Sequence, residues 1–146
     1  METRLATLAD APHLVALHQA SFGDAAWDLA QLTDSLSLPT SQTWLVGQGA
    51  PQGFILCQIV ADEAEILTFC VKPNLRRQGI GRLLLEQAIQ AARQQKARRL
   101  FLEVAADNLT AIALYQKNGF QPNGIRHGYY NHGGRKIDAL MLSRDL

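Results

Sequence analysis

A single α+β domain built on a mixed sheet is the fold that this sequence predicts. Three apolar segments between residues 43 and 71 follow one another with loops of only a few residues, as in an antiparallel meander. After residue 73, helical and strand-like patterns alternate. With 146 residues, 47% of them apolar and 18% charged, the chain has the length and composition of a globular domain with a buried core. We therefore expect residues 1–146 to form one domain.

The N-terminal half predicts a strand, two helices and three further strands. Asp10 offers a cap for the first helix, and Pro39 ends the second because proline has no amide proton to donate. The expected elements are a strand at Thr3–Leu8, helices from the Asp10 cap to Phe22 and from Trp27 to Leu38, and strands at Thr43–Gln48, Gly53–Ala61 and Ala64–Val71. Short loops between the last three strands predict an antiparallel meander.

The C-terminal half predicts two helices and three strands. The first helix follows a glycine-rich segment and places on one face Ile80, Leu83, Leu84, Ala88, Ala91 and Ala92. The apolar strand Arg98–Val104 should lie near the centre of the sheet, and the helix Asn108–Asn118 should end at Gly119. Two last strands, Gln121–Tyr129 and Lys136–Leu142, flank a turn at "NHGGR".

Charge, cysteines and hydropathy argue against several classes of function. The formal net charge is +1, so no overall field draws the protein to nucleic acid, and the basic residues between 93 and 99 read as a solvated helix end. Cys57 and Cys70 lie in apolar strands outside any CxxC motif, which favours buried, reduced thiols. The N-terminal segment lacks the apolar core of a signal peptide, and no run reaches the ~18 apolar residues of a membrane helix. We expect a cytoplasmic protein with no nucleic-acid or membrane partner.

The segment Asn74–Ala88, "NLRRQGIGRLLLEQA", carries the clearest chemical signal. Glycine costs a helix roughly 1 kcal/mol relative to alanine, so Gly79 and Gly81 need a reason. A helix N-terminus binds anions through unpaired N–H groups, and glycine leaves room for a phosphate. Positive charge comes from three neighbouring side chains, Arg76, Arg77 and Arg82. Leu84 replaces the third glycine of a dinucleotide motif, and no Gly-Lys-Ser/Thr follows, so the segment predicts another pyrophosphate site or a tight turn.

Two motifs resemble those of the GNAT acetyltransferase superfamily. "RRQGIG" is similar to its Arg/Gln-x-x-Gly-x-Gly/Ala signature, and "NLTAIALYQKNGF" is similar to its Asn-x-x-Ala-x-x-x-Tyr-x-x-x-Gly-Phe helix. The resemblance implies a mostly antiparallel sheet flanked by helices, with acetyl-CoA in the cleft between two splayed central strands. It also implies the residues of the acetyl-CoA site, which are Phe69, Cys70, Val71, Arg76, Arg77, Gln78, Gly79, Ile80, Gly81, Arg82 and Asn108.

Glu103 and Tyr115 are the candidate catalytic residues. Alternation along residues 100–104 puts Glu103 near the end of an apolar strand, where burial would raise its pKa; the alternative is a solvent-facing glutamate. "LEVAADN" and "AIALY" resemble the bacterial N-acetyltransferases that modify the N-terminal alanine of a small-subunit ribosomal protein. That resemblance implies that Glu103 accepts a proton and Tyr115 donates one. Otherwise Tyr115 is a core aromatic near Phe120, and Asn108 with Asp107 is an ordinary helix cap.

The acceptor side carries weaker signals. Trp27 and the pair Tyr129–Tyr130 are candidate substrate contacts because aromatic rings offer rigid contact area for a peptide, with a core role as the alternative for either tyrosine. The sequence departs from the alanine-acetylating enzymes at Ala25–Ala26, Asn131 and Cys70. The expected reaction moves the acetyl group of acetyl-CoA to the free N-terminal amine of a ribosomal protein, without a metal. A small-molecule amine as acceptor and a non-catalytic CoA-binding module are the alternatives.

Overall fold

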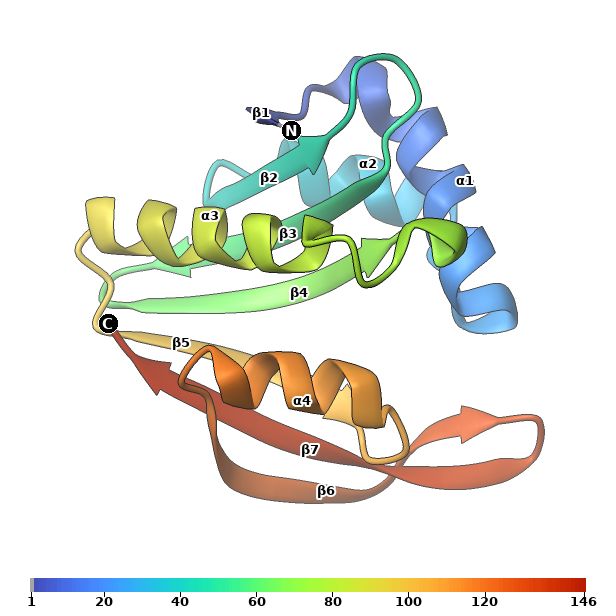
Figure 1. Ribbon diagram of the computed structural model, residues 1–146, viewed down its shortest axis with the longest axis vertical. Coiled ribbons are helices and arrows are strands. Elements are labelled where there is room, and N and C mark those ends of the chain that lie inside the picture. The colour runs from blue at the N-terminus through green and yellow to red at the C-terminus, as the bar shows by residue number, and fades with distance from the viewer. Residues whose placement is uncertain (1) are drawn as a thin grey trace.

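The computed structural model describes residues 2–146. Seven strands form one sheet in the order β1-β2-β3-β4-β5-β7-β6, with helices on both of its faces (Figure 1). Neighbouring strands are antiparallel except for β4 and β5, which run parallel. The predicted mixed, mostly antiparallel sheet flanked by helices is confirmed.

The N-terminal part differs from the prediction at two boundaries. Its elements are β1 (Thr3–Leu5), a 3-10 turn at Leu8–Asp10, α1 (Ala11–Phe22), a 3-10 turn at Gly23–Ala25 and α2 (Leu29–Ser37). The predicted first strand is too long, because the Asp10 carboxylate accepts a hydrogen bond from the Thr7 amide (2.8 Å) and the chain turns at Leu8. The predicted second helix starts too early, because Asp28 caps α2 by accepting a hydrogen bond from the Gln31 amide (2.8 Å). Trp27 therefore precedes the helix.

The strands β2 (Ser41–Val46), β3 (Gly53–Val60) and β4 (Glu63–Val71) form the predicted antiparallel meander. The β3–β4 register shifts between Leu56 and Cys57, which leaves Leu67 as an extra residue in β4. Such a bulge reverses the alternation of side chains along a strand. Ile66 and Phe69 consequently face the same side of the sheet, whereas Thr68 and Cys70 face the other.

The C-terminal part follows the predicted order. A 3-10 turn at Pro73–Leu75 leads to α3 (Ile80–Gln94), β5 (Arg99–Ala105), α4 (Leu109–Lys117), β6 (Gln121–His132) and β7 (Arg135–Asp145). β5 lies centrally between β4 and β7, and α4 ends before Gly119, whose φ of +87° suits a C-terminal glycine. The last hairpin is longer than predicted, because Gly133 and Gly134 both have positive φ and form a two-residue turn beside paired His132 and Arg135.

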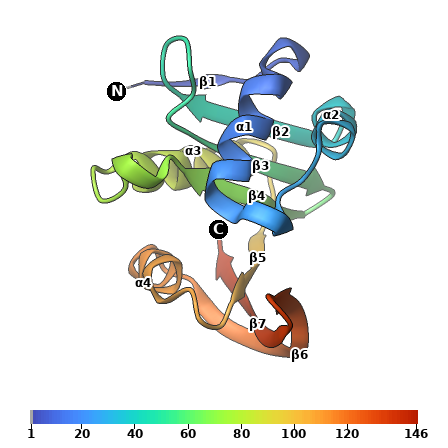
Figure 2. The same cartoon turned by 90° about the vertical axis from the view of Figure 1, so that its right-hand side faces the viewer.

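Helices α3 and α4 cover one face of the sheet and α1 and α2 the other (Figure 2), and an apolar core lies under each pair. The core under α3 and α4 contains Leu84, Leu100, Cys57 and Tyr115. The core under α1 and α2 contains Leu14, Leu32, Phe54 and Cys70. The two cysteines are free and buried in different cores, and burial raises the pKa of each thiol to about 12. The prediction of buried, reduced cysteines is confirmed.

The centre of the sheet opens at one end. β4 and β5 pair over only three residues, Glu63–Glu65 with Arg99–Phe101. Beyond them β4 stays paired with β3 as far as Val71, and β5 stays paired with β7 as far as Ala105. Because neighbouring strands in a sheet are twisted relative to one another, each follows its own partner and the carboxyl ends of β4 and β5 separate (Figure 1). α3 follows β4 and α4 follows β5 at this open end.

Candidate active site

The open end leaves one edge of β4 without a strand partner. Phe69, Cys70 and Val71 pair with β3 on one side, and the β5 pairing has already ended at Glu65. Backbone N–H and C=O groups that point away from β3 are therefore available to a ligand, as at any exposed strand edge. The three residues of β4 that the sequence analysis assigned to the acetyl-CoA site thus lie at a strand edge that a ligand can reach.

The two glycines at the start of α3 have different structural roles. Gly79 is the N-cap with φ +86°, in the left-handed region that favours glycine, and no atom lies within 4 Å of the place a Cβ would take. A Cβ on Gly81 would instead meet Leu114 of α4 at 3.3 Å and Phe69 of β4 at 3.5 Å. Gly79 therefore makes the turn and leaves open space at the helix start, while Gly81 lets α3 pack closely on both neighbours.

The N-terminus of α3 has the properties of an anion site. No side chain caps it, so the first N–H groups of the helix lack an internal partner. Exposed side chains surround it: Arg76, Arg77 and Gln78. Ile80 is buried at 3% exposure and can contribute only its backbone, and Arg82 is paired with Glu86 one turn further along the helix (2.9 Å). Unpaired amides with mobile positive charge nearby suit a pyrophosphate.

Asn108 faces the same open end from the other strand. It is the N-cap of α4, and its Oδ1 accepts a hydrogen bond from the Ala111 amide (3.2 Å). The predicted helix cap is confirmed. Capping engages the side-chain oxygen and leaves the Nδ2 protons for another acceptor.

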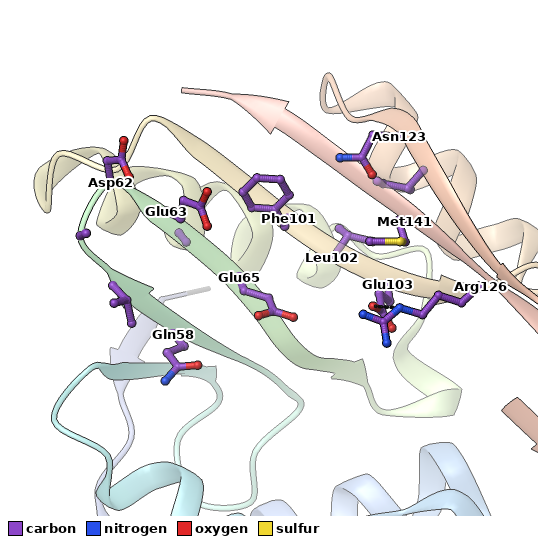
Figure 3. A pocket seen from close by; sticks show the side chains of 14 residues that line it. Gln58, Asp62, Glu63, Glu65, Phe101, Leu102, Glu103, Asn123, Arg126 and Met141 are labelled. Carbon is purple, nitrogen blue, oxygen red and sulfur yellow. Dashed lines mark ion pairs between the residues drawn. The ribbon is translucent and has the colours of Figure 1, made fainter. Parts of the chain in front are cut away.

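Glu103 lies on β5 at the rim of a hollow in the sheet face opposite α3. Its side chain is 20% exposed, and its Oε1 is 3.1 Å from Nε of Arg126 on β6. Both residues line a hollow of about 590 Å³, together with Glu65, Phe101 and Met141 (Figure 3). The surroundings are therefore not the purely apolar strand end that the alternation suggested, because a guanidinium faces the carboxylate.

Two residues of this hollow were missed by sequence reasoning, Glu65 and Arg126. The parallel register sets Glu65 beside Phe101, two positions from Glu103 on the neighbouring strand. Burial raises the pKa of Glu65, and the negative charge of Glu103 raises it further. The alternation of apolar and polar residues in β4 predicts only that Glu65 points away from the core. That Glu65 lies near Glu103 depends on the pairing of β4 with β5, which cannot be read from the sequence.

Tyr115 projects from α4 into the core and is 7% exposed. Its ring packs against Phe69 (centroids 6.1 Å apart) and edge-on against Phe120 (5.7 Å). Burial raises the pKa of its phenol, and the nearby Tyr130 adds to the rise. The Tyr115 hydroxyl oxygen is not among the buried side-chain polar atoms of the described residues that lack a hydrogen-bond partner. The predicted core packing of the ring is therefore confirmed, and it is compatible with proton donation by the hydroxyl.

The three predicted acceptor contacts differ in their surroundings. Tyr130 is half-buried, and burial followed by the charge of Glu103 raises the pKa of its phenol, so it lies near the candidate base. Tyr129 is 53% exposed and packs edge-on against Tyr130 (5.1 Å), with the Arg126 guanidinium over its ring. Trp27 is half-buried against the core under α1 and α2. The structure thus sets Tyr130 close enough to Glu103 to feel its charge, whereas Trp27 packs against the core under α1 and α2.

Comparison with known proteins decides the family. The model of the acetyltransferase (GNAT) family matches residues 5–120, which include the anion site, Glu103 and Tyr115. The chain belongs to the GNAT family and is an N-acetyltransferase.

Relatives of this GNAT protein include enzymes named for one substrate. The [ribosomal protein bS18]-alanine N-acetyltransferase of Escherichia coli is 38% identical over 99 residues, which are 68% of this chain and 67% of the relative. The crystal structure of the E. coli ribosomal-protein-S18-alanine N-acetyltransferase superposes with a TM-score of 0.92 at 28% identity, covering 99% of this chain and 92% of that one. Arabidopsis thaliana NAA60 in complex with acetyl-CoA shares the fold, with a TM-score of 0.88 at 19% identity over 99% and 98% of the two chains.

The residues of this GNAT chain fit acetyl-CoA. Beside Gly79 the helix start has uncapped amides and free space suited to a pyrophosphate, and β4 has an unpaired edge whose backbone groups suit the amides of a pantetheine arm. Within residues 2–146, no three His, Cys, Asp or Glu side chains gather as metal ligands. No helix of the described chain is long and apolar enough to cross a membrane.

Proposed function

We propose that this acetyltransferase, as a single domain of residues 1–146 acting in the cytoplasm, transfers the acetyl group of acetyl-CoA to the N-terminal α-amine of a protein. The proposed acceptor is the N-terminal alanine of a small-subunit ribosomal protein. One observation supports the chemistry: β4 and β5 part after Glu65, Glu103 lies there on one face of the sheet, and Tyr115 packs against Phe69 of the free β4 edge on the other face. The names of the E. coli relatives support the acceptor.

Acetyl-CoA supplies the thioester that is attacked. In this proposal the amides at the start of α3 hold its pyrophosphate, with Arg76 and Arg77 beside them. The free edge of Phe69–Val71 and the side-chain amide of Asn108 hold its pantetheine arm. These contacts place the thioester between the two strands, because the phosphate site and the β4 edge both lie at their open end.

Glu103 acts as the general base. An α-ammonium has a pKa of about 7.7–8.0 and a lysine ammonium about 10.4, so an α-amine gives up its proton more easily at neutral pH. The ammonium first loses one proton to solvent. As the lone pair of the neutral amine attacks the thioester carbonyl, the Glu103 carboxylate takes the second proton from the nitrogen. The ion pair with Arg126 holds the carboxylate in place at the rim of the hollow.

Tyr115 acts as the general acid. When the carbon–sulfur bond breaks, the thiolate of CoA needs a proton, and the Tyr115 hydroxyl supplies it. Burial keeps this phenol protonated, because the pKa is raised above its ordinary value. The rings of Phe69 and Phe120 fix its direction. The products are the N-acetylated peptide and free CoA, and the proton on Glu103 returns through solvent to Tyr115.

Mass spectrometry on two short peptides tests the proposed function. One peptide starts with a free alanine and has no lysine; the other is blocked at its N-terminus and has one internal lysine. We expect acetyl-CoA-dependent acetylation of the first alone, at one site. Acetylation of the lysine peptide, or of neither peptide, contradicts the proposal and directs the search to small amines.

Two variants connect that activity to the site. Glu103→Gln should remove most of the turnover, whereas Arg126→Gln keeps the carboxylate and should retain a larger share. Equal activity of the wild type and Glu103→Gln excludes Glu103 as the base.

A further inference from the structure

His18 is a buried histidine that the proposed chemistry does not use. It lies on α1, is 3% exposed, and both ring nitrogens have partners. The Trp27 amide donates a hydrogen bond to Nδ1 (3.0 Å), and Nε2 lies 2.7 Å from Oγ1 of Thr68 on β4. Because a backbone N–H can only donate, Nδ1 carries no proton. The single ring proton is therefore on Nε2, which donates to Thr68.

The two partners of His18 come from two parts of the candidate active site. Trp27 lies in the connection between α1 and α2 and is one of the predicted acceptor contacts, packed against the core under those helices. Thr68 immediately precedes Phe69, where β4 has left β5 and offers its free edge. The end of α1 lies over β4 in Figure 2, and the ring spans from one to the other.

Around Trp27, the described connection between α1 and α2 is held by few other hydrogen bonds. Ala26 donates to Gly23, and Asp28 is held within the α2 cap through Gln31. Trp27, between them, donates its amide to His18. The imidazole is itself packed among aromatic rings, with centroids 4.5 Å from Phe22, 5.5 Å from Trp27 and 6.1 Å from Phe54. A ring held on several sides can fix the backbone of the segment that bonds to it.

We propose that His18 is a positioning residue, which holds the Trp27 segment against Thr68 of β4 and so sets this predicted acceptor contact relative to the acetyl-CoA edge. This inference rests on the proposed function. It assigns to His18 an effect on acceptor binding and none on the chemistry. Loosening the segment should weaken binding of the acceptor peptide, while acetyl-CoA still finds the α3 amides and the β4 edge.

Three variants separate the two hydrogen bonds from the packing. His18→Phe keeps an aromatic ring and loses both bonds. His18→Asn keeps a short side-chain acceptor for the Trp27 amide, and Thr68→Val removes the second bond while leaving the histidine. The matched control is Thr43→Val on β2, because Thr43 is also buried (4% exposed, against 9% for Thr68) and its hydroxyl has no partner among the described residues.

The measurements are the KM for the free-alanine peptide, kcat, the Kd of acetyl-CoA by calorimetry, and hydrogen exchange of the Trp27 amide. For His18→Phe we expect about a tenfold rise in peptide KM, acetyl-CoA affinity within twofold of wild type, and Trp27 exchange at least tenfold faster. His18→Asn should restore part of the exchange protection and of the KM, and Thr43→Val should change neither.

Unchanged peptide KM in both His18→Phe and Thr68→Val overturns the proposal, as does an equal loss of peptide and acetyl-CoA affinity. If His18→Phe does not fold, His18→Asn and Thr68→Val decide the same question. If the wild type acetylates no peptide, the proposed function fails by itself. Hydrogen exchange then still decides whether His18 holds the Trp27 segment, since it needs no substrate.

Discussion

Replacing Gly79 by alanine tests whether the start of α3 binds the pyrophosphate. Gly79 has φ +86°, and a Cβ there would meet no atom within 4 Å. An L-residue in this left-handed conformation costs roughly 1–2 kcal/mol, which for a domain of this size lowers Tm by about 2–8 °C. The new methyl group would also stand in the open space beside the uncapped amides.

The expected loss of acetyl-CoA affinity follows from the amides that the methyl group obstructs. A hydrogen bond to a charged group contributes about 1.5–3 kcal/mol, so losing one such bond raises Kd on the order of ten- to a hundredfold. Isothermal calorimetry at 25 °C measures the Kd, and thermal unfolding without ligand measures the stability cost. Both quantities are needed, because strain by itself would lower Tm without touching the ligand.

Gly119→Ala is the matched control. Gly119 has φ +87°, and its added Cβ would meet only the Arg144 side chain at an ordinary 3.5 Å. The two variants should lose similar stability, and Gly119→Ala should bind acetyl-CoA as the wild type does. Wild-type affinity in Gly79→Ala, or an equal affinity loss in both variants, would refute the assignment of the pyrophosphate to this helix start.

Three further predictions concern the reaction and the pH. Glu103→Gln should lower kcat about 10²- to 10⁴-fold with acetyl-CoA affinity nearly intact, and an unchanged pH–rate profile in stopped-flow assays would contradict a base role. Tyr115→Phe keeps the ring packing, so Tm should stay within a few degrees while kcat falls; wild-type turnover would return Tyr115 to the core alone. Burial lowers the pKa of His18 from 6.5 to about 4, so its neutral form stabilises the fold above pH 6.5, and that contribution is lost as the pH falls toward 4. Urea unfolding should show a flatter dependence between these values for His18→Gln, and an identical curve would exclude the histidine as its source.

The parts of this protein that follow from local sequence are those set by backbone conformation within a few residues. Gly79 and Gly119 mark where a helix starts and where one ends, since each has a positive φ that other residues rarely adopt. The candidate anion site at the start of α3 is equally local, because consecutive residues supply its amides. The meander and the central position of β5 could be predicted too, as short loops and an apolar run leave few other arrangements.

Helix and strand boundaries were wrong where a side chain overrode the periodic pattern. Asp10 is the N-cap residue of α1 as expected, but its carboxylate accepts a hydrogen bond from the Thr7 amide instead of from the helix, and the first strand ends early. Trp27 was expected inside a helix, but the Asp28 cap excludes it. Several acidic or hydroxyl side chains could serve as caps, and the choice among them depends on packing.

The side chains of the candidate site are brought together by contacts between segments that are distant in the sequence. Glu65 and Glu103 share one hollow only because β4 and β5 pair for three residues and then separate, and Arg126 arrives from a third strand. His18 meets Thr68, fifty positions away, because the bulge at Leu67 turns that threonine toward α1. Side-chain alternation predicts which face of its own strand a residue lies on. Register, bulges and twist decide which residues of other strands and helices lie next to it, and these are set only when the whole sheet and its two cores pack together.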